Sequence, residues 1–444
     1  MKAKIYLILG ALLVTTFANA QKSKLWTLQQ CVDTALANNR NVKQQILTKK
    51  TREISYDQAR KNLLPDLNGR IGQNYGFGRS LDENYKYTNS AAITQTTSLG
   101  FSSSVTLFNA FKLKNNIEAR KADMYASEAD LGKIKSDITT SVAAEFLQIL
   151  LNKELLQIAT DQLELTKTKI EQRHALVGAG KMAEGELYEL IAQQSKEELS
   201  KLQAQNTLNL SLLDLAQFLE LAHFENLDVV APENLSESDL KLLSADEVFE
   251  SALTHRPEIK GAEFRLKSSE LNVLTSRADY YPRLDLSANF SSTYYKDNSK
   301  DALGQIKIYD SFGKQLSDKL NAGISLTLSI PIFDKYQARN NVRTAQLGVE
   351  SSKISVDNAK LELKKSIQQA YYNAIAAKSR WEASQKSEIS SREAYRFANQ
   401  KFEAGRGTSY ELYQAKSNLT QVLSEQAQAK YEYFFRVKLL ELLK

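Results

Sequence analysis

Residues 324–336 read ISLTLSIPIFDKY, and residues 99–111 read LGFSSSVTLFNAF. In both segments apolar residues alternate with small polar ones, and a stretch with helical periodicity follows directly. Alternation at a period of two predicts a strand with one apolar face and one small polar face. The sequence therefore predicts, twice in one chain, a strand that leads straight into a helix.

The chain consists of two similar halves. Matching residues lie 217 positions apart near the start of each half, 225 apart at the strands and 227 apart at two glycine-containing breaks. We therefore predict tandem repeats at residues 21–230 and 231–444, each with the order helix, strand, loop, strand, very long helix, glycine break, helix. The matches are Ala35 and Leu36 with Ala252 and Leu253, Pro65 with Pro282, the two strands above, and Gly178 and Gly180 with Gly405 and Gly407.

The longest predicted helix of each repeat has the seven-residue spacing of a coiled coil and contains no proline. A helix of roughly 68 residues would be about 100 Å long. The first repeat's shorter helices, residues 28–64 and 186–224, are about half that length, so two of them stacked end to end would match one long helix. Antiparallel coiled coils at about residues 110–224 and 334–442 therefore suggest a cylinder wall. The spaced apolar residues include Ile117, Met124, Leu131, Leu347, Ile354 and Leu361.

Four strands are predicted, within about residues 67–108 and 284–332. Such strands fit an ordinary sheet on a soluble core, and equally a membrane barrel with lipid outside and water inside. Four strands are fewer than the about eight of the smallest barrels, and open sheet edges are not tolerated in lipid. In a membrane the chains must therefore associate, and three copies would supply twelve strands. The predicted strands are residues 67–78, 98–108, 284–295 and 322–332, with Leu284, Leu286, Ala288, Phe290, Phe101 and Val105 on apolar faces and Phe108 on a polar face.

The first 20 residues have the features of a signal peptide. Lys2 and Lys4 precede an apolar run, and Ala18 and Ala20 form a small-x-small cleavage pattern, so we expect the mature chain to begin at Gln21. The formal net charge is +6 without a block of lysine and arginine, which argues against nucleic-acid binding. The long polar loops at residues 79–97 and 296–320 are expected to face the cell exterior.

Catalysis has little support in the sequence. The three histidines are scattered, no nucleophile–base pattern is present, and Cys31 is the only cysteine. We expect no catalytic residue, no metal site and no cofactor, and we expect Cys31 to be a small buried apolar residue.

The sequence resembles the TolC-like outer-membrane efflux factor family over nearly all of residues 26–444. The resemblance rests on the tandem repeat, on LQQCVDTALANNRNV (residues 28–42) with its second copy ALTHRPEI (residues 252–259), on the proline after each first helix, and on two glycine turns followed by an acidic residue. Arg40 replaces a proline usual in the first copy. The first glycine turn is two residues longer than the second.

The resemblance implies an α+β membrane protein. It implies a homotrimer with a shared 12-stranded transmembrane β-barrel in outer-membrane lipid, continuous with a periplasmic α-barrel of long coiled-coil helices. It further implies an exit duct for efflux pumps or type I secretion, with a periplasmic adaptor and an inner-membrane transporter as partners. A soluble periplasmic coiled-coil adaptor or scaffold is the alternative that the residue pattern leaves open.

The two glycine turns are the candidate functional positions. Helix reversal alone explains the residue types: glycine accepts positive φ, Thr408 or Ser409 can cap the returning helix, and Glu411 suits its first turn. The resemblance adds that Glu411 would face the narrowest part of the tunnel as a ring of three carboxylates, with Glu186 at the matching position. It also implies that Arg406 and Tyr410 latch neighbouring helices. The expected adaptor-contact turns comprise Val177, Gly178, Gly180, Gly405, Arg406 and Gly407.

Overall fold

The computed structural model describes residues 24–79, 92–180, 183–221, 227–231, 242–298, 305 and 308–444. The expected signal peptide, Lys181 and parts of the two expected exterior loops lie outside the described residues. The chain forms two compact units. Unit 1 comprises Met1–Thr48, Glu128–Lys260 and Asp357–Lys444, and unit 2 comprises Lys49–Ser127 and Gly261–Val356. Each unit thus combines segments from both halves of the chain.

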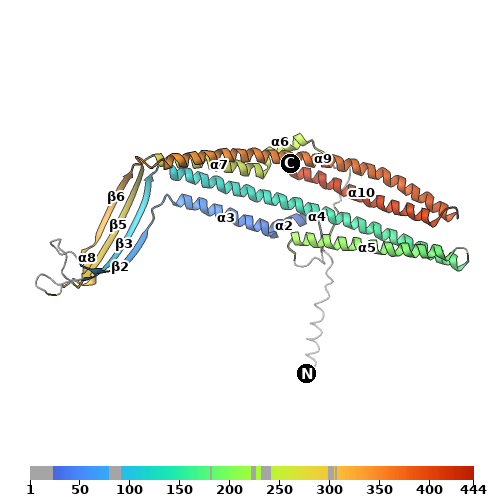
Figure 1. Ribbon diagram of the computed structural model, residues 1–444, viewed down its shortest axis with the longest axis horizontal. Coiled ribbons are helices and arrows are strands. Elements are labelled where there is room, and N and C mark those ends of the chain that lie inside the picture. Colours follow the sequence, from blue (N-terminus) through green and yellow to red (C-terminus); the bar gives the residue numbers. More distant parts are fainter. Residues whose placement is uncertain are drawn as a thin grey trace, which may run out of the picture. The chain divides into compact units, whose positions relative to one another are not determined.

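The two halves of the chain run through a similar order of helices and strands (Figure 1). The first half contains β1 (Lys24–Trp26), α2 (Leu28–Asn38), α3 (Arg40–Lys61), β2 (Asn68–Gly78), β3 (Ala92–Phe108), α4 (Lys112–Gly178) and α5 (Glu184–Phe218). The second contains β4 (Leu227–Val229), α6 (Ala245–His255), α7 (Pro257–Arg277), the 3₁₀ turn η2 (Ala278–Tyr280), β5 (Arg283–Asp297), α8 (Phe312–Asp318), β6 (Asn321–Ser329), α9 (Gln337–Glu403) and α10 (Ser409–Leu443).

Unit 1 is helical, and its largest apolar cluster joins α2, α4, α5 and α10. Phe146, Ile149 and Leu215 are fully buried there, and Cys31 is 0% exposed, which confirms the expected buried role of this cysteine. Burial raises the pKa of the Cys31 thiol to about 11. The thiol therefore stays protonated and unreactive at neutral pH.

A small parallel sheet of β1 and β4 borders this cluster. Lys153 of α4 donates to the carbonyl of Val229 at 2.7 Å and forms an ion pair with Asp228. The sequence did not predict this sheet, because each strand has only three residues.

The first helix of each half is broken, which corrects the prediction of one helix over residues 28–64. Asn39 has an extended ψ of 131°, and its side-chain oxygen accepts a hydrogen bond from the N–H of Asn41 at 2.9 Å. This asparagine therefore ends α2 and caps α3 without the help of a proline. Arg256 makes the equivalent break with ψ 128°, because the following Pro257 disfavours helical geometry at the residue before it.

Three further helix and strand bounds differ from the predictions. Helix α5 ends at Phe218 rather than near residue 224, and the positive φ of 52° at Glu220 lies in the turn that follows. Strand β3 begins at Ala92, six residues before the predicted start, because Ile93 and its neighbours pair with both β2 and β5. Strand β6 ends at Ser329, two residues before Pro331.

Unit 2 contains an antiparallel four-stranded sheet in the order β2-β3-β5-β6. Its register places Leu284, Leu286 and Ala288 opposite Leu328, Leu326 and Ile324, so these side chains share one face. Serine, threonine, asparagine and glycine predominate on the other face. Strands β2 and β6 are the edges, and in Figure 1 they lie on opposite sides of the group of arrows.

A β-bulge corrects one predicted position on this sheet. The register shifts between Thr106 and Phe108, so Phe108 lies opposite Leu284. The extra residue of a bulge reverses the alternation beyond it. Phe108 therefore lies on the apolar face, whereas uninterrupted alternation placed it on the polar face.

Helix α8 covers the part of β5 that β6 does not reach. Strand β6 pairs with β5 only as far as Ser291. Beyond that point the buried side chain of Gln315 accepts a hydrogen bond from the N–H of Tyr295 at 3.1 Å, and Ser292 donates to the carbonyl of Leu316 at 2.7 Å. This helix lies within residues 296–320, which the sequence predicted only as a loop. Among the described residues, no helix combines the length and apolar composition that crossing a bilayer requires.

Both strand-to-helix junctions have the same strained geometry. Ala110 and Phe111 precede α4 with φ values of 49° and 62°, and Lys335 and Tyr336 precede α9 with values of 56° and 65°. Non-glycine residues rarely adopt the left-handed region, at a cost of roughly 1–2 kcal/mol each. The strain lets each strand turn into its helix within a few residues.

Replacing Ala110 by glycine should therefore stabilise the protein. We expect Ala110→Gly to raise the free energy of unfolding by about 0.5–1 kcal/mol, because the relief of left-handed strain exceeds the extra entropy of the unfolded chain. The exposed Ala376 in the middle of α9 is a matched control, where the same change should lower stability by up to about 1 kcal/mol. Urea unfolding of the detergent-solubilised protein, followed by circular dichroism, measures both. Equal effects of the two variants would contradict the prediction.

Candidate functional site at the helical turns

The turn between α9 and α10 is a Schellman motif. Helix α9 ends at Glu403, and Gly405 adopts φ +71°. The N–H of Gly405 donates to the carbonyl of Phe402 at 3.0 Å, and the N–H of Arg406 donates to the carbonyl of Lys401 at 2.9 Å. These two bonds satisfy carbonyls that the helix end would otherwise leave unpaired.

A close backbone contact favours glycine at position 407. A Cβ atom at this position would lie 3.2 Å from the backbone nitrogen of Phe402 and 3.3 Å from the carbonyl carbon of Lys401. The next residue, Thr408, is the N-cap of α10, and its hydroxyl accepts a hydrogen bond from the N–H of Glu411 at 3.2 Å. Of the two predicted capping residues, Thr408 therefore has this role.

The turn between α4 and α5 is built in a similar way. Val177 and Gly178 are the last residues of α4, and Gly180 has φ +70° with its N–H donating to the carbonyl of Val177 at 2.9 Å. Ala183 is the N-cap of α5 and makes no side-chain capping bond, while Glu186 lies in the first turn. The acidic first turn stabilises α5 through the helix dipole.

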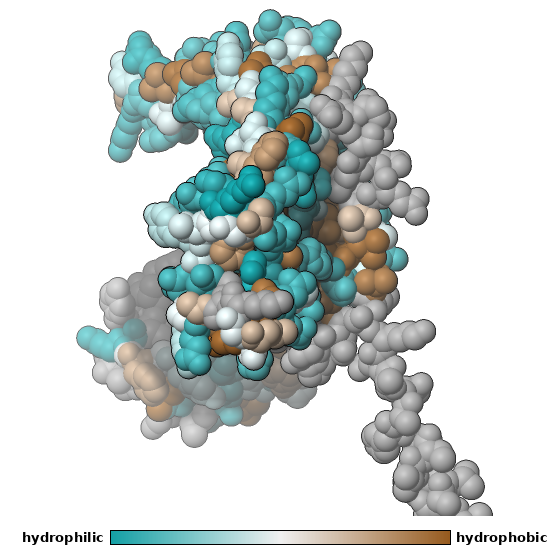
Figure 2. Space-filling view, turned by 90° about the vertical axis from the view of Figure 1, so that its right-hand side faces the viewer, coloured by the Kyte–Doolittle hydropathy of each residue, from teal (hydrophilic) through white to brown (hydrophobic). Residues whose placement is uncertain are grey.

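The predicted gate residues do not gather within one chain. Glu411 is exposed and forms an ion pair with Lys401 across the turn, with Nζ and Oε2 3.1 Å apart. Arg406 and Tyr410 are exposed, and their side chains have no hydrogen-bond or ion-pair partner among the described residues. Glu186 is half-buried in the other turn. The end of unit 1 that carries the turns is mainly hydrophilic, with apolar side chains in small patches (Figure 2).

Other residues connect the two helical hairpins near these turns. Ser409 at the start of α10 donates to Glu189 of α5, and Lys169 of α4 donates to Asn399 of α9. The guanidinium of Arg173 lies 4.4 Å from the ring centroid of Phe402, within cation–π range. No sequence pattern predicts these contacts, because they join residues more than 200 positions apart.

A buried polar network lies deeper along the same helices. Lys416 of α10 is 4% exposed, and its Nζ lies 2.8 Å from Oε1 of Glu197 on α5. The ammonium also donates to Thr166 and to the carbonyl of Gln162 at 2.9 Å, both on α4. Thr166 in turn donates to Oε2 of Glu197 at 2.6 Å. One ammonium group therefore connects three helices from both halves of the chain.

Burial lowers the pKa of the ammonium groups of both Lys416 and Lys169, and the nearby carboxylates of Glu197 and Glu403 offset this only in part. A lysine with a lowered folded-state pKa binds fewer protons in the folded than in the unfolded state. Its contribution to stability therefore rises as the pH increases through that lowered pKa.

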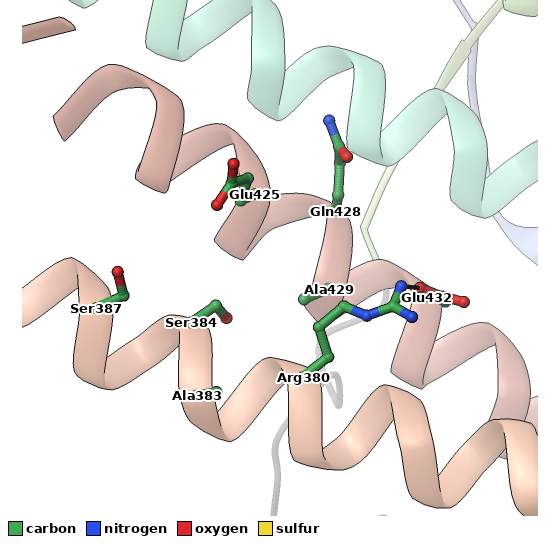
Figure 3. Close-up of a pocket in the computed structure, with 8 residues that line it drawn as sticks. All are labelled: Arg380, Ala383, Ser384, Ser387, Glu425, Gln428, Ala429 and Glu432. Atoms are coloured by element: carbon green, nitrogen blue, oxygen red, sulfur yellow. Dashed lines mark hydrogen bonds and ion pairs between the residues drawn. The ribbon is translucent and has the colours of Figure 1, made fainter. Parts of the chain in front are cut away.

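Two polar grooves run between the helices of unit 1. One of about 470 Å³ borders the Lys416 network. The other, of about 370 Å³, lies between α9 and α10 (Figure 3). There Arg380 of α9 extends toward Glu432 of α10 and donates to it at 2.6 Å, while Ala383, Ser384 and Ala429 leave the space open. Neither groove contains a nucleophile–base arrangement, and the described residues contain no group of three His, Cys, Asp or Glu that could hold a metal ion.

The model of the outer membrane efflux protein family matches residues 31–219 and 248–440, one segment in each half of the chain. The protein belongs to this family. It is accordingly an outer-membrane protein of efflux transport, in a family of channel proteins rather than enzymes.

Individual relatives have low sequence identity to this chain, but their alignments cover most of it. Toxin and drug export protein A of Aggregatibacter actinomycetemcomitans is 22% identical over 387 residues, which cover 85% of this chain and 77% of the relative. Cation efflux system protein CusC of Escherichia coli K12 is 24% identical over 375 residues, 80% of this chain and 73% of CusC. A solved structure of CusC aligns with a TM-score of 0.77 and 17% identity over 94% of this chain and 91% of that chain. The chain therefore has the fold of these outer-membrane channels.

Removing one member of the buried pair should cost far more than removing an exposed charge. We expect Glu197→Gln to lower the free energy of unfolding by about 3 kcal/mol, because it leaves the buried ammonium of Lys416 without a counter-charge. The double variant Glu197→Gln with Lys416→Met should regain most of that loss.

The control is Glu382→Gln. It removes an exposed carboxylate 3.8 Å from Lys378 and should cost less than about 0.5 kcal/mol. Urea unfolding in detergent compares the three variants with the parent. If Glu197→Gln costs no more than Glu382→Gln, the ion pair does not hold these helices.

Proposed function

We propose that the protein is the outer-membrane exit duct of a tripartite efflux or type I secretion system. It conducts substrates passively, after an inner-membrane transporter and a periplasmic adaptor have delivered them. The observation that carries this proposal is the four-stranded sheet with one apolar face, one small polar face and two unpaired edges.

The sheet edges support assembly as a homotrimer. Strand β2 pairs only with β3, and β6 pairs only with β5, among the described residues. In lipid both edges need a further strand, because an unpaired N–H or C=O group there costs several kcal/mol. Pairing β6 of one copy with β2 of the next satisfies all edges once the ring closes. Three copies give a 12-stranded barrel, with the apolar face toward lipid and the polar face toward water.

The helices support the same assembly. Leu47 and Ile54 of α3 are exposed and seven positions apart, and Leu347, Ile354 and Leu361 form a similar exposed row on α9. Seven-residue spacing is the pattern of a coiled-coil seam. Helices of neighbouring copies bury these rows and form the wall of a periplasmic tunnel.

The helical turns form the periplasmic end of the duct in this proposal. Glu411 of three copies creates a carboxylate ring at the narrowest point, and Glu186 lies in the matching turn. Arg406 and Tyr410 find their partners on neighbouring copies, which fits their exposure within one chain. The turns at residues 177–180 and 404–407 contact the adaptor.

The oligomeric state is the first test. In mild detergent we expect the mass of a homotrimer, because only a closed ring pairs every strand edge. Mass photometry or native mass spectrometry measures this. A stable monomer or dimer would overturn the proposed barrel.

Conductance tests the carboxylate ring. In planar bilayers we expect Glu411→Gln to raise the concentration of a multivalent cation needed for half-block by about tenfold, or about 1.4 kcal/mol of binding free energy. Glu393→Gln removes an exposed carboxylate that is paired with Arg396 on α9 and is the control. If both variants block at the parent's concentration, Glu411 only stabilises its helix.

A further inference from the structure

A hollow of about 380 Å³ lies in unit 2 beside the junction of β3 and α4. Phe111, Lys114 and Asn115 line one side, and Leu274, Arg277 and Tyr281 line the other. It is distant in sequence from the helical turns, and none of its residues belongs to the duct gate proposed above.

Two cations border this hollow without a counter-charge. Neither Lys114 nor Arg277 forms an ion pair with any residue that the structure describes. Asp279, two residues beyond Arg277 in the sequence, is paired with Lys112. No acidic residue lines the hollow, so the two positive charges that border it attract an anion.

Apart from Asn115, the rest of the lining is largely apolar, and its large side chains are exposed. Phe111 is 65% exposed, Tyr281 59% and Leu274 44%. Phe111 also contacts Phe108 edge-to-face, with ring centroids 6.3 Å apart, and Phe108 belongs to the apolar face of the sheet. The cationic hollow is thus continuous with a surface that water solvates poorly. A freely soluble anion would contact only the basic side chains, whereas an anionic lipid would contact both the basic and the apolar side chains.

The same arrangement of aromatic and basic side chains occurs at the second junction. Phe108, Phe111 and Lys114 are spaced by three residues, and so are Phe333, Tyr336 and Arg339. The ring centroids of Phe333 and Tyr336 are 5.8 Å apart, and the guanidinium of Arg339 lies 5.8 Å from the Tyr336 ring, compared with 6.0 Å between Lys114 and Phe111. In both places the central aromatic residue has a positive φ, which the backbone adopts only under strain.

We propose that the hollow beside α4 binds the headgroup of an anionic phospholipid. The phosphodiester lies between the ammonium of Lys114 and the guanidinium of Arg277, which can bind two phosphate oxygens at once. The glycerol and the first acyl carbons lie along Phe111, Leu274 and Tyr281. The proposal rests on the proposed function only in placing the sheet in the membrane, which puts this hollow at the leaflet facing the periplasm.

The test measures lipid binding to the full-length protein in detergent. Native mass spectrometry with added phosphatidylglycerol should show saturable binding that is about 25-fold weaker for the double variant Lys114→Gln with Arg277→Gln. This estimate takes a factor of about five for each basic residue at a lipid headgroup. Arg277→Lys keeps the charge and should stay within about threefold of the parent.

The control variant Lys133→Gln with Lys135→Gln removes two exposed charges from α4 outside the hollow and should bind as the parent does. Equal affinity of the parent and the Lys114/Arg277 double variant would overturn the proposal. Inorganic phosphate that competes as strongly as the lipid would also overturn it, because the site would then bind free anions. The masses in the same spectra report the oligomeric state, so failure of the trimer is seen separately from failure of lipid binding.

Discussion

Pairing of backbone groups at the sheet edges is the constraint on which the rest of the structure depends. The strands of unit 2 have an apolar face that no other part of the described unit covers, and their two edges lack partners. Such a sheet would aggregate in water, because its exposed edges pair with other chains. In the proposed barrel, lipid covers the apolar face, and a closed ring of strands pairs both edges.

The helices of unit 1 pack in two ways. Large apolar side chains such as Phe146 and Leu215 form the main cluster, while small side chains such as Ala370, Ala374 and Ala377 let α9 and α10 approach each other closely around Trp381. The buried ammonium of Lys416 adds positional specificity to this packing. A lysine with three fixed acceptors tolerates only one register of α10 against α4 and α5, whereas alanine and leucine contacts tolerate several.

Local rules predicted much of the fold from the sequence. Alternation identified the strands and most of their faces, seven-residue spacing identified the long helices, and Gly405 and Thr408 followed from the chemistry of helix ends. The features that the sequence did not predict depend on contacts between distant parts of the chain. The break at Asn39 is made by a side chain that can equally lie inside a helix, and the bulge at Thr106 depends on pairing with β5. At the candidate site, the partners of Lys416 lie more than 200 positions away, and no sequence period connects them.

The junctions between strands and long helices show why strain persists in this fold. Strand β3 and helix α4 follow each other almost directly, so the chain has only the residues between Phe108 and Lys112 in which to change conformation. Glycine would adopt the required positive φ without strain, yet an alanine and a phenylalanine stand there. In the proposed barrel, an aromatic residue at this position supplies a large amphipathic surface at the boundary between lipid and water, which glycine lacks. On this proposal, contacts between these aromatic side chains and lipid offset the backbone strain, and the same account applies to Tyr336 at the second junction.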